Sequence, residues 1–220
     1  MTFLDTTHSI NLSCPINQLG YGLSGLNITK SLIDLKQDVS LFPIGNIEAT
    51  DEHTDMLKSA IGSARTPDWK APSIKMWHQH DMAQFVGNGT KYGFPIFELD
   101  RFTDLELHHL HYLDNWIVTS QWGKDYVKEH THIVPLGVDR EVFREATSHK
   151  EETIFFNCGK WEVRKGHDVL IKAFNEAFNE DDNVELWMMC DNPFYPEEEN
   201  FKWDRLYRSS KLGEKVRIIP

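Results

Sequence analysis

Long apolar runs are scarce in this chain of 220 residues. The runs at residues 154–156 and 186–189 are far shorter than the roughly 20 apolar residues that cross a bilayer as a helix. The first ten residues, MTFLDTTHSI, lack the basic stretch and the apolar core of a secretory signal. These absences predict a cytoplasmic protein with no transmembrane segment.

Cysteine is also sparse. Cys14, Cys158 and Cys190 are an odd set without the spacing of a disulfide framework, and each lies in or beside an apolar stretch. Disulfides persist mainly in oxidising compartments. The pattern therefore predicts buried, reduced thiols.

Basic residues are outnumbered. The 23 Lys and Arg face 34 Asp and Glu, which gives a net charge of -11 at pH 7. Binding to nucleic acid or to anionic lipid depends on a basic face, so neither is expected as a partner. A small phosphorylated ligand is not excluded, because a local pair of cations can bind phosphate inside an acidic protein. The hydrophobic share of 40% is ordinary for a globular protein with a core.

Segments typical of strands and of helices alternate along the chain, which predicts parallel sheets with helical crossovers. The sequence VDREVFREATSHKEE at 138–152 is polar and interrupts this pattern. We therefore expect an α/β protein with two Rossmann-like domains, at residues 1–138 and 153–220, joined by a linker at 139–152. The second domain is expected to be incomplete, because its pattern holds about three strands where five or six are usual.

The individual elements follow from periodicity and from capping residues. Thr103 and Ser120 are each placed to cap a helix. The strand at 153–158 is expected to be buried. Strands are expected at residues 8–16, 39–44, 73–78, 92–99, 115–119, 132–136, 153–158, 183–190 and 215–219, and helices at 25–36, 103–113, 121–129, 167–178 and 197–212.

The first candidate site is a glycine motif, Gly20-Tyr21-Gly22-Leu23-Ser24-Gly25, which follows a strand and opens a helix. Glycines let a backbone approach a ligand, and a helix N-terminus offers free N–H groups to an anion. Gly20, Gly22 and Gly25 are therefore candidate phosphate-binding residues. A tight turn without a ligand and a dinucleotide site are the alternatives. For a dinucleotide site the acid that holds the ribose comes late, at Glu48.

The second candidate is the loop GKWEVRKG at residues 159–166, directly after an apolar strand. Three cations lie within six residues, and the loop leads into a helix whose dipole adds to their field. We expect this loop to bind a diphosphate; a solvated surface loop is the alternative. The phosphate-binding candidates are Gly159, Lys160, Arg164 and Lys165.

The third candidate is the sequence WHQHD at residues 77–81, at the end of a strand, where His78 or His80 could point into a cleft. Structural histidines and a metal site are the alternatives. His108, His109 and His111 add further imidazoles, but they lie on an expected helix and face several directions. No Asp/His set with the spacing of metal ligands follows them, so no metal is expected.

These motifs together resemble the family-four retaining glycosyltransferases of the GT-B fold. The segment GKWEVRKGHDVLIKAFNEAF is similar to the first strand, loop and helix of their donor domain, and VPLGVD at 134–139 with Phe143 is similar to the end of their first domain. The glycine loop resembles the family's N-terminal loop. The three motifs occur in the family's order along nearly the whole chain. A pair of glutamates that the family carries late in its donor domain has no counterpart here.

The resemblance implies transfer of a sugar from a nucleotide-sugar donor to an acceptor hydroxyl, on a saccharide or another molecule, in glycan biosynthesis. Lys160 and Lys165 would stabilise the leaving diphosphate, and His80, or else His78, would lie beside the transferred sugar. No metal or other cofactor is implied. These 220 residues are expected to be an inactive or partial fragment that can associate with itself. A non-catalytic module that binds a glycan or a partner, and an NAD-binding oxidoreductase, are the rival hypotheses.

Overall fold

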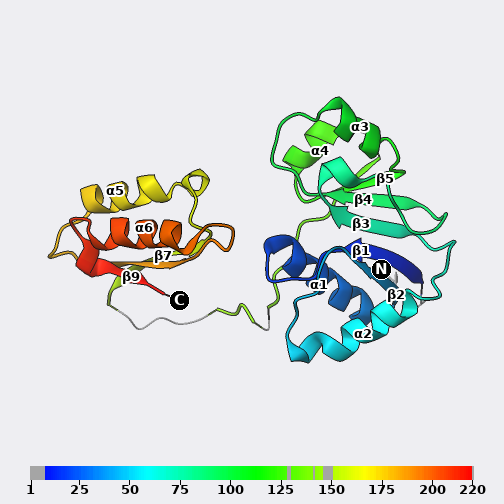
Figure 1. The fold of residues 1–220 in the computed structure, drawn as a ribbon, viewed down its shortest axis with the longest axis horizontal. Helices are drawn as coiled ribbons and strands as arrows, with labels where there is room; N and C mark the ends of the chain where they lie inside the picture. The colour runs from blue at the N-terminus through cyan, green and yellow to red at the C-terminus, as the bar shows by residue number, and fades with distance from the viewer. Residues whose placement is uncertain (1–7, 128–129, 141, 146–150, 220) are drawn as a thin grey trace. The chain divides into compact units, whose positions relative to one another are not determined.

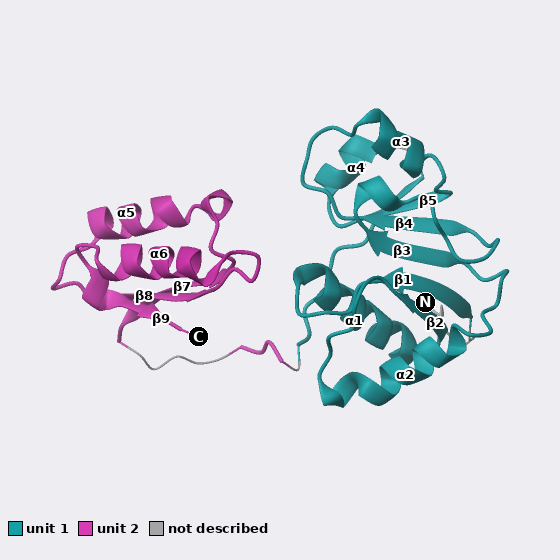
Figure 2. Ribbon diagram, in the orientation of Figure 1, with its two compact units in different colours: residues 1–140 teal, residues 141–220 magenta. Residues whose placement is uncertain are grey.

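The computed structural model describes residues 8–127, 130–140, 142–145 and 151–219. The chain divides into two compact units, Met1–Arg140 and Glu141–Pro220 (Figure 2). The division falls within the stretch 139–152 that the sequence predicts as a linker, of which residues 141 and 146–150 lie outside the described residues. Both units are mixed α/β structures with parallel sheets, as the sequence predicts.

The sheet of the first unit has six parallel strands in the order β2-β1-β3-β4-β5-β6 (Figure 1). Alternating strands and helices produce this arrangement, because two parallel strands need a crossover connection between them. The strands are β1 Ser9–Cys14, β2 Asp38–Pro43, β3 Ser73–Trp77, β4 Lys91–Pro95, β5 Asn115–Val118 and β6 Thr131–Ile133.

The helices of the first unit agree with the expected ones, with one addition and one shift. Helix α2 was not expected, and α1 begins at Gly20 and so contains the whole glycine motif. Both predicted caps are present: Thr103 and Glu106 form a reciprocal capping box, and the Ser120 hydroxyl accepts from the Gly123 N–H at 3.2 Å. The helices are α1 Gly20–Asp34, α2 Thr54–Ser63, α3 Asp104–Leu110 and α4 Gln121–Val127, with short 3-10 turns at Asp51–His53 and Gln79–Asp81.

The core of this unit gathers around β1, whose last four residues are all buried. Aliphatic side chains from the central strands pack there against those of α2. This packing holds the strands in place and so positions the loops at their carboxyl ends. The buried residues are Leu12, Cys14, Ile16, Val39, Leu41, Leu57, Ala60, Met76 and Phe94.

The second unit is a parallel sheet in the order β7-β8-β9 with two helices on one face (Figure 1). The strands advance in one direction across the sheet, and right-handed crossovers then place both helices on the same side. The elements are β7 Thr153–Gly159, α5 His167–Ala177, β8 Val184–Cys190, α6 Glu197–Arg208 and β9 Val216–Ile218, with 3-10 turns at Val163–Lys165 and Gly213–Lys215.

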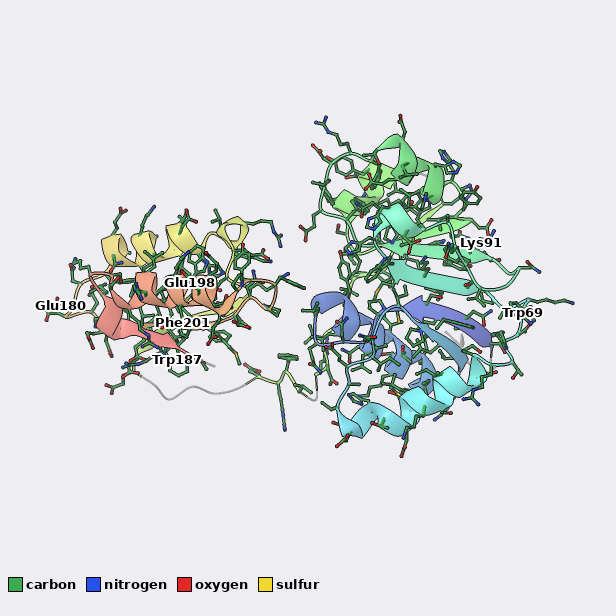
Figure 3. All side chains as sticks on the ribbon, viewed as in Figure 1. Trp69, Lys91, Glu180, Trp187, Glu198 and Phe201 are labelled. Carbon is green, nitrogen blue, oxygen red and sulfur yellow. The ribbon has the colours of Figure 1, made fainter. Side chains whose placement is uncertain are left out.

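The expectation that residues 153–158 form a buried strand is wrong. Phe155 is 41% exposed and Phe156 is 59% exposed. The register pairs Phe156 with Trp187 on the face opposite the two helices, where Figure 3 shows the Trp187 side chain. In the described part of the chain no helix covers this face, and β8 is the one strand that pairs with β7. Apolar composition identifies a strand but does not ensure that both of its faces are covered.

The expectation of buried thiols holds for two of the three cysteines. Cys14 and Cys190 are buried and free, whereas Cys158 is free and exposed, on the uncovered face beside Met189. Burial raises the pKa of the Cys14 thiol to about 12 and that of Cys190 to about 11, so both remain protonated at neutral pH. Among the described residues, none of the helices combines the length and apolar character that crossing a membrane demands.

The uncovered face predicts self-association of residues 1–220, because parallel sheets are normally covered on both faces. We expect light scattering to show dimers or larger species at micromolar concentration. Replacing Phe156 and Met189 together with lysine should raise the monomer fraction. The control is Val169→Lys, since Val169 is 61% exposed on α5. A monodisperse monomer for the unmodified chain would contradict this prediction.

Candidate functional site

The order of strands marks the place in the first unit where a ligand is expected. The chain builds the sheet in one direction from β1 to β2 and then in the other direction from β3 onward. Ligands of open α/β sheets bind at such a switch point, outside the carboxyl ends of the strands. β1 and β3 pair directly, so the loops that follow Cys14 and Trp77 meet at this point.

The glycine motif forms the start of α1 at this edge. Leu19, the N-cap residue, makes no side-chain hydrogen bond to the helix, and no acidic residue lies in the first turn. The N–H groups at a helix N-terminus carry partial positive charge. A β-carbon added at Gly20 would have no atom within 4 Å, so the backbone there is open to a ligand.

Gly22 and Gly25 are explained by packing. A β-carbon at Gly22 would overlap Asn17, and one at Gly25 would overlap the Pro15 carbonyl oxygen. Both glycines therefore let α1 lie close against the segment that follows β1. Of the three glycines of the motif, only Gly20 has open space where a β-carbon would lie.

The two histidines of WHQHD gather beside this helix start. The His78 and His80 rings stack with centroids 5.2 Å apart and planes at 14°. The Tyr21 hydroxyl lies 3.4 Å from His78 Nδ1 and donates to the Ile96 carbonyl oxygen at 3.2 Å. Tyr21 and His78 are 57 residues apart in the chain, and the β1–β3 pairing brings them together. The fold thus joins two of the predicted motifs.

The electrostatics of this cluster favour a neutral imidazole at His78. Burial, and then the neighbouring His80, lower the pKa of His78. Burial, and then the Glu98 carboxylate, raise the pKa of Tyr21, so its hydroxyl keeps its proton. A neutral imidazole and a phenol can exchange hydrogen bonds with the hydroxyl groups of a ligand without introducing a net charge.

The turn that carries the histidines is fastened to its neighbours. Gln79 Nε2 donates to Glu106 Oε1 at 2.9 Å, and Glu106 belongs to the capping box of α3. The buried Lys75 ammonium lies 3.3 Å from the Asp81 carboxylate. The loop therefore presents half-buried His78 and exposed His80 from a fixed backbone.

The second unit holds the cationic loop at the carboxyl edge of its own sheet. Gly159 ends β7, residues 163–165 form a 3-10 turn, and Gly166 caps α5 with a left-handed φ of 72°. The Gly166 carbonyl oxygen accepts from the Val169 and Leu170 N–H groups. The loop passes directly into the positive end of a helix of 11 residues.

The cations of the loop differ in their partners. Glu162 lies 3.5 Å from the Lys160 ammonium and 3.2 Å from the Arg164 guanidinium. The Lys160 ammonium also lies 4.9 Å from the centre of the Phe194 ring. Lys165 is exposed, and its ammonium makes no ion pair with another described residue. Each cation can reach a phosphate only from the loop's outer surface, because the inner side is packed.

That inner side is formed by Trp161, which the sequence places inside the loop but which belongs to the core. Its ring is 2% exposed and stacks on Trp203 with planes at 3°. Two hydrogen bonds hold the adjacent backbone, one from His167 and one from Asn192. Trp161 therefore anchors the loop and does not face a ligand.

A metal site and a surface hollow on α6 are the two other places where a ligand could be sought. In the described ranges, no group of three or more His, Cys, Asp and Glu side chains could hold a metal ion, and His108 and His109 lie in the last turn of α3. A surface hollow lined by side chains of α6 and its C-cap, among them the labelled Glu198 and Phe201 (Figure 3), contains none of the predicted site residues.

Sequence reasoning missed three residues of these sites. Tyr21 occupies a variable position of the glycine motif, and Asn192 and His167 are ordinary polar residues of a loop and a helix start. Their roles depend on contacts that span 57, 31 and 7 residues. The one signal for Asn192 in the sequence is its position two residues beyond the strand expected at 183–190.

We predict that Gly25→Ala destabilises the first unit by about 1–3 kcal/mol, because the added methyl group overlaps backbone that cannot move freely. Gly20→Ala, in open space, should change stability by less than about 0.5 kcal/mol. Urea denaturation followed by circular dichroism gives both free energies of unfolding. Equal effects of the two substitutions would show that the close packing of α1 is not a constraint.

We also predict a pH dependence from His78. Its pKa is lowered in the folded protein, so the unfolded chain binds the proton more readily and stability falls as pH drops below about 6.5. His78→Gln should lose less stability than the unmodified chain between about pH 7 and pH 5.5. Thermal denaturation at both values tests this, with exposed His111→Gln as the control. An unchanged pH dependence in His78→Gln would contradict it.

No protein-family model matches the chain, and a search of the curated proteins finds no match. Among solved structures, the chain is similar to that of HepE from Anabaena in complex with UDP-glucose, at 13% sequence identity and a TM-score of 0.61. The match covers 96% of this chain and 68% of that chain. At this identity the likeness shows the fold: two Rossmann-like domains, of which the second is small here.

Proposed function

We propose that the chain forms part of a glycosyltransferase that uses a nucleotide-sugar donor. The observation that carries the proposal is that each unit has its candidate motif at the carboxyl edge of a parallel sheet. In the first unit this motif is the Tyr21, His78 and His80 cluster at the switch point, and in the second it is the cationic loop before α5. The fold likeness to a protein crystallised with UDP-glucose supports it.

The second unit binds the diphosphate of the donor in this proposal. Lys165 offers an exposed ammonium, Lys160 a second one, and the start of α5 adds the helix dipole. As the bond between the anomeric carbon and the phosphate oxygen breaks, negative charge builds on the leaving diphosphate. Fixed cations that meet this charge lower the barrier, commonly by the largest single contribution. Two ammonium groups can do so without a divalent metal.

The first unit contacts the sugar and the acceptor. In this proposal the stacked rings of His80 and His78 contact the transferred sugar, and the open backbone at Gly20 contacts the phosphate or the acceptor. The acceptor hydroxyl attacks the anomeric carbon on the face from which the phosphate departs, and the leaving phosphate takes its proton. The configuration at the anomeric carbon is then retained. No carboxylate nucleophile is required.

The rival functions give different results in one titration. Binding of UDP or GDP, with no binding of NADH, favours the transferase; the reverse result favours an oxidoreductase that uses the glycine motif. Binding of a glycan with no affinity for any nucleotide favours a non-catalytic module. In a turnover assay, the anomeric configuration of the product, measured by NMR, tests retention.

We predict that Lys165→Ala and Lys160→Ala each weaken binding of UDP-glucose at least about tenfold, because each removes a charge-assisted hydrogen bond to the diphosphate. Where turnover is measured, each should cost roughly 2–4 kcal/mol of transition-state stabilisation. Lys172→Ala is the matched control, since Lys172 is exposed on α5 beyond the loop. Isothermal titration calorimetry measures the affinities. Unchanged binding by the double variant Lys160→Ala, Lys165→Ala would overturn the proposed function.

A further inference from the structure

Two buried side chains hold the backbone of the cationic loop at successive residues. His167 Nε2 lies 2.9 Å from the Lys160 carbonyl oxygen, and Asn192 Nδ2 donates to the Trp161 carbonyl oxygen at 3.0 Å. Both side chains are 1% exposed. Because a carbonyl oxygen can only accept, His167 carries its proton on Nε2. The loop is therefore fastened at two adjacent peptide groups, next to the lysine that is proposed to bind phosphate.

Asn192 is itself held in one orientation. Its Oδ1 accepts from the Phe194 N–H at 3.1 Å, which places Nδ2 toward Trp161. Its backbone N–H donates to Asn200 Oδ1, and its carbonyl oxygen accepts from Asn200 Nδ2, each at 3.1 Å. The backbone and the side chain of Asn192 are thus both held, and its side chain links the loop between β8 and α6 to the cationic loop.

The other anchor is equally constrained. The Tyr207 hydroxyl donates to the His167 carbonyl oxygen at 2.7 Å, and the Trp161 ring packs against His167, Trp203 and Tyr207. The backbone at Lys160 therefore cannot move without breaking buried hydrogen bonds. Its ammonium is flanked by Phe194, two residues beyond Asn192. One loop thus fixes the backbone of Lys160 and also contacts its charged end.

We infer that Asn192 and His167 are positioning residues for the cationic loop, which they hold in the conformation that binds a diphosphate. The inference rests on the proposed function of Lys160 and Lys165. A loop that is ordered before binding loses less conformational entropy when the ligand arrives. Removing either hydrogen bond should free the backbone, and part of the binding free energy would then be spent on ordering it.

The test uses UDP and the whole chain. Asn192→Ala is expected to raise the Kd for UDP about tenfold by isothermal titration calorimetry. The matched control is Asn175→Ala. The Asn175 side chain also donates from Nδ2 to a backbone carbonyl oxygen, that of Ile171 at 2.7 Å, but this hydrogen bond lies within α5. Both variants should lower the melting temperature, and the control should change the Kd by less than twofold.

A conservative pair tests the second anchor. His167→Gln keeps a donor near the position of Nε2 and should bind UDP within about threefold of the unmodified chain, whereas His167→Leu should lose about tenfold. Equal affinities for His167→Leu and His167→Gln would overturn the role of His167. If affinity for UDP falls in proportion to stability in both Asn192→Ala and Asn175→Ala, Asn192 has only a structural role.

A measurement without ligand separates this inference from the proposed function. Hydrogen exchange of a peptide that covers residues 159–166 should accelerate in Asn192→Ala and remain unchanged in Asn175→Ala. If the unmodified chain binds no UDP while the exchange behaves as expected, the proposed function fails and the anchoring of the loop stands. If UDP binds and neither exchange nor Kd responds to Asn192→Ala, the inference itself is wrong.

Discussion

Parallel pairing of strands is the constraint on which the rest of this structure depends. It places every carboxyl end of a sheet at one edge, and crossover helices begin at that same edge. In the first unit the pairing of β1 with β3 brings the start of α1 beside the turn after β3. In the second, the pairing of β7 with β8 brings the cationic loop beside the loop that carries Asn192. Each candidate site is a consequence of one strand pair.

Much of the fold could be predicted from the sequence because its signals are local. Alternating apolar strands and amphipathic helices indicated parallel sheets, and Thr103 and Ser120 marked helix starts through hydrogen bonds that span three residues. The exposure of β7 could not be predicted, because it depends on which face the helices cover. Helix α2 was missed although its signal is local: in TDMLKSAIGS the apolar residues Met56, Leu57, Ala60 and Ile61 recur at helical spacing and lie in or against the core.

In the candidate sites, too, local features could be predicted from the sequence and contacts between distant residues could not. Motifs with fixed spacing, such as the glycines at 20–25 and the cations at 160–165, could be identified from residue types alone. The packing that explains Gly25, the partner of His78 and the buried role of Trp161 could not, because each requires knowing what lies across a strand pair or a helix. A pattern of residues predicts that a backbone approaches something closely. It does not say whether that is a ligand or the protein's own Pro15 carbonyl group.

A further constraint is electrostatic. With a net charge of -11 the chain repels a diphosphate at long range, although salt screens this repulsion beyond about 8 Å. Attraction must therefore come from groups close to the ligand. In the cationic loop Glu162 already pairs with Lys160 and Arg164, so a phosphate that reached Lys160 would compete with this carboxylate. Exposed Lys165 makes no ion pair with another described residue, although the carboxylate of Asp168 lies in the first turn of α5. In the proposed function Lys165 therefore makes the first contact with the anion, and Lys160 joins once its ion pair with Glu162 opens.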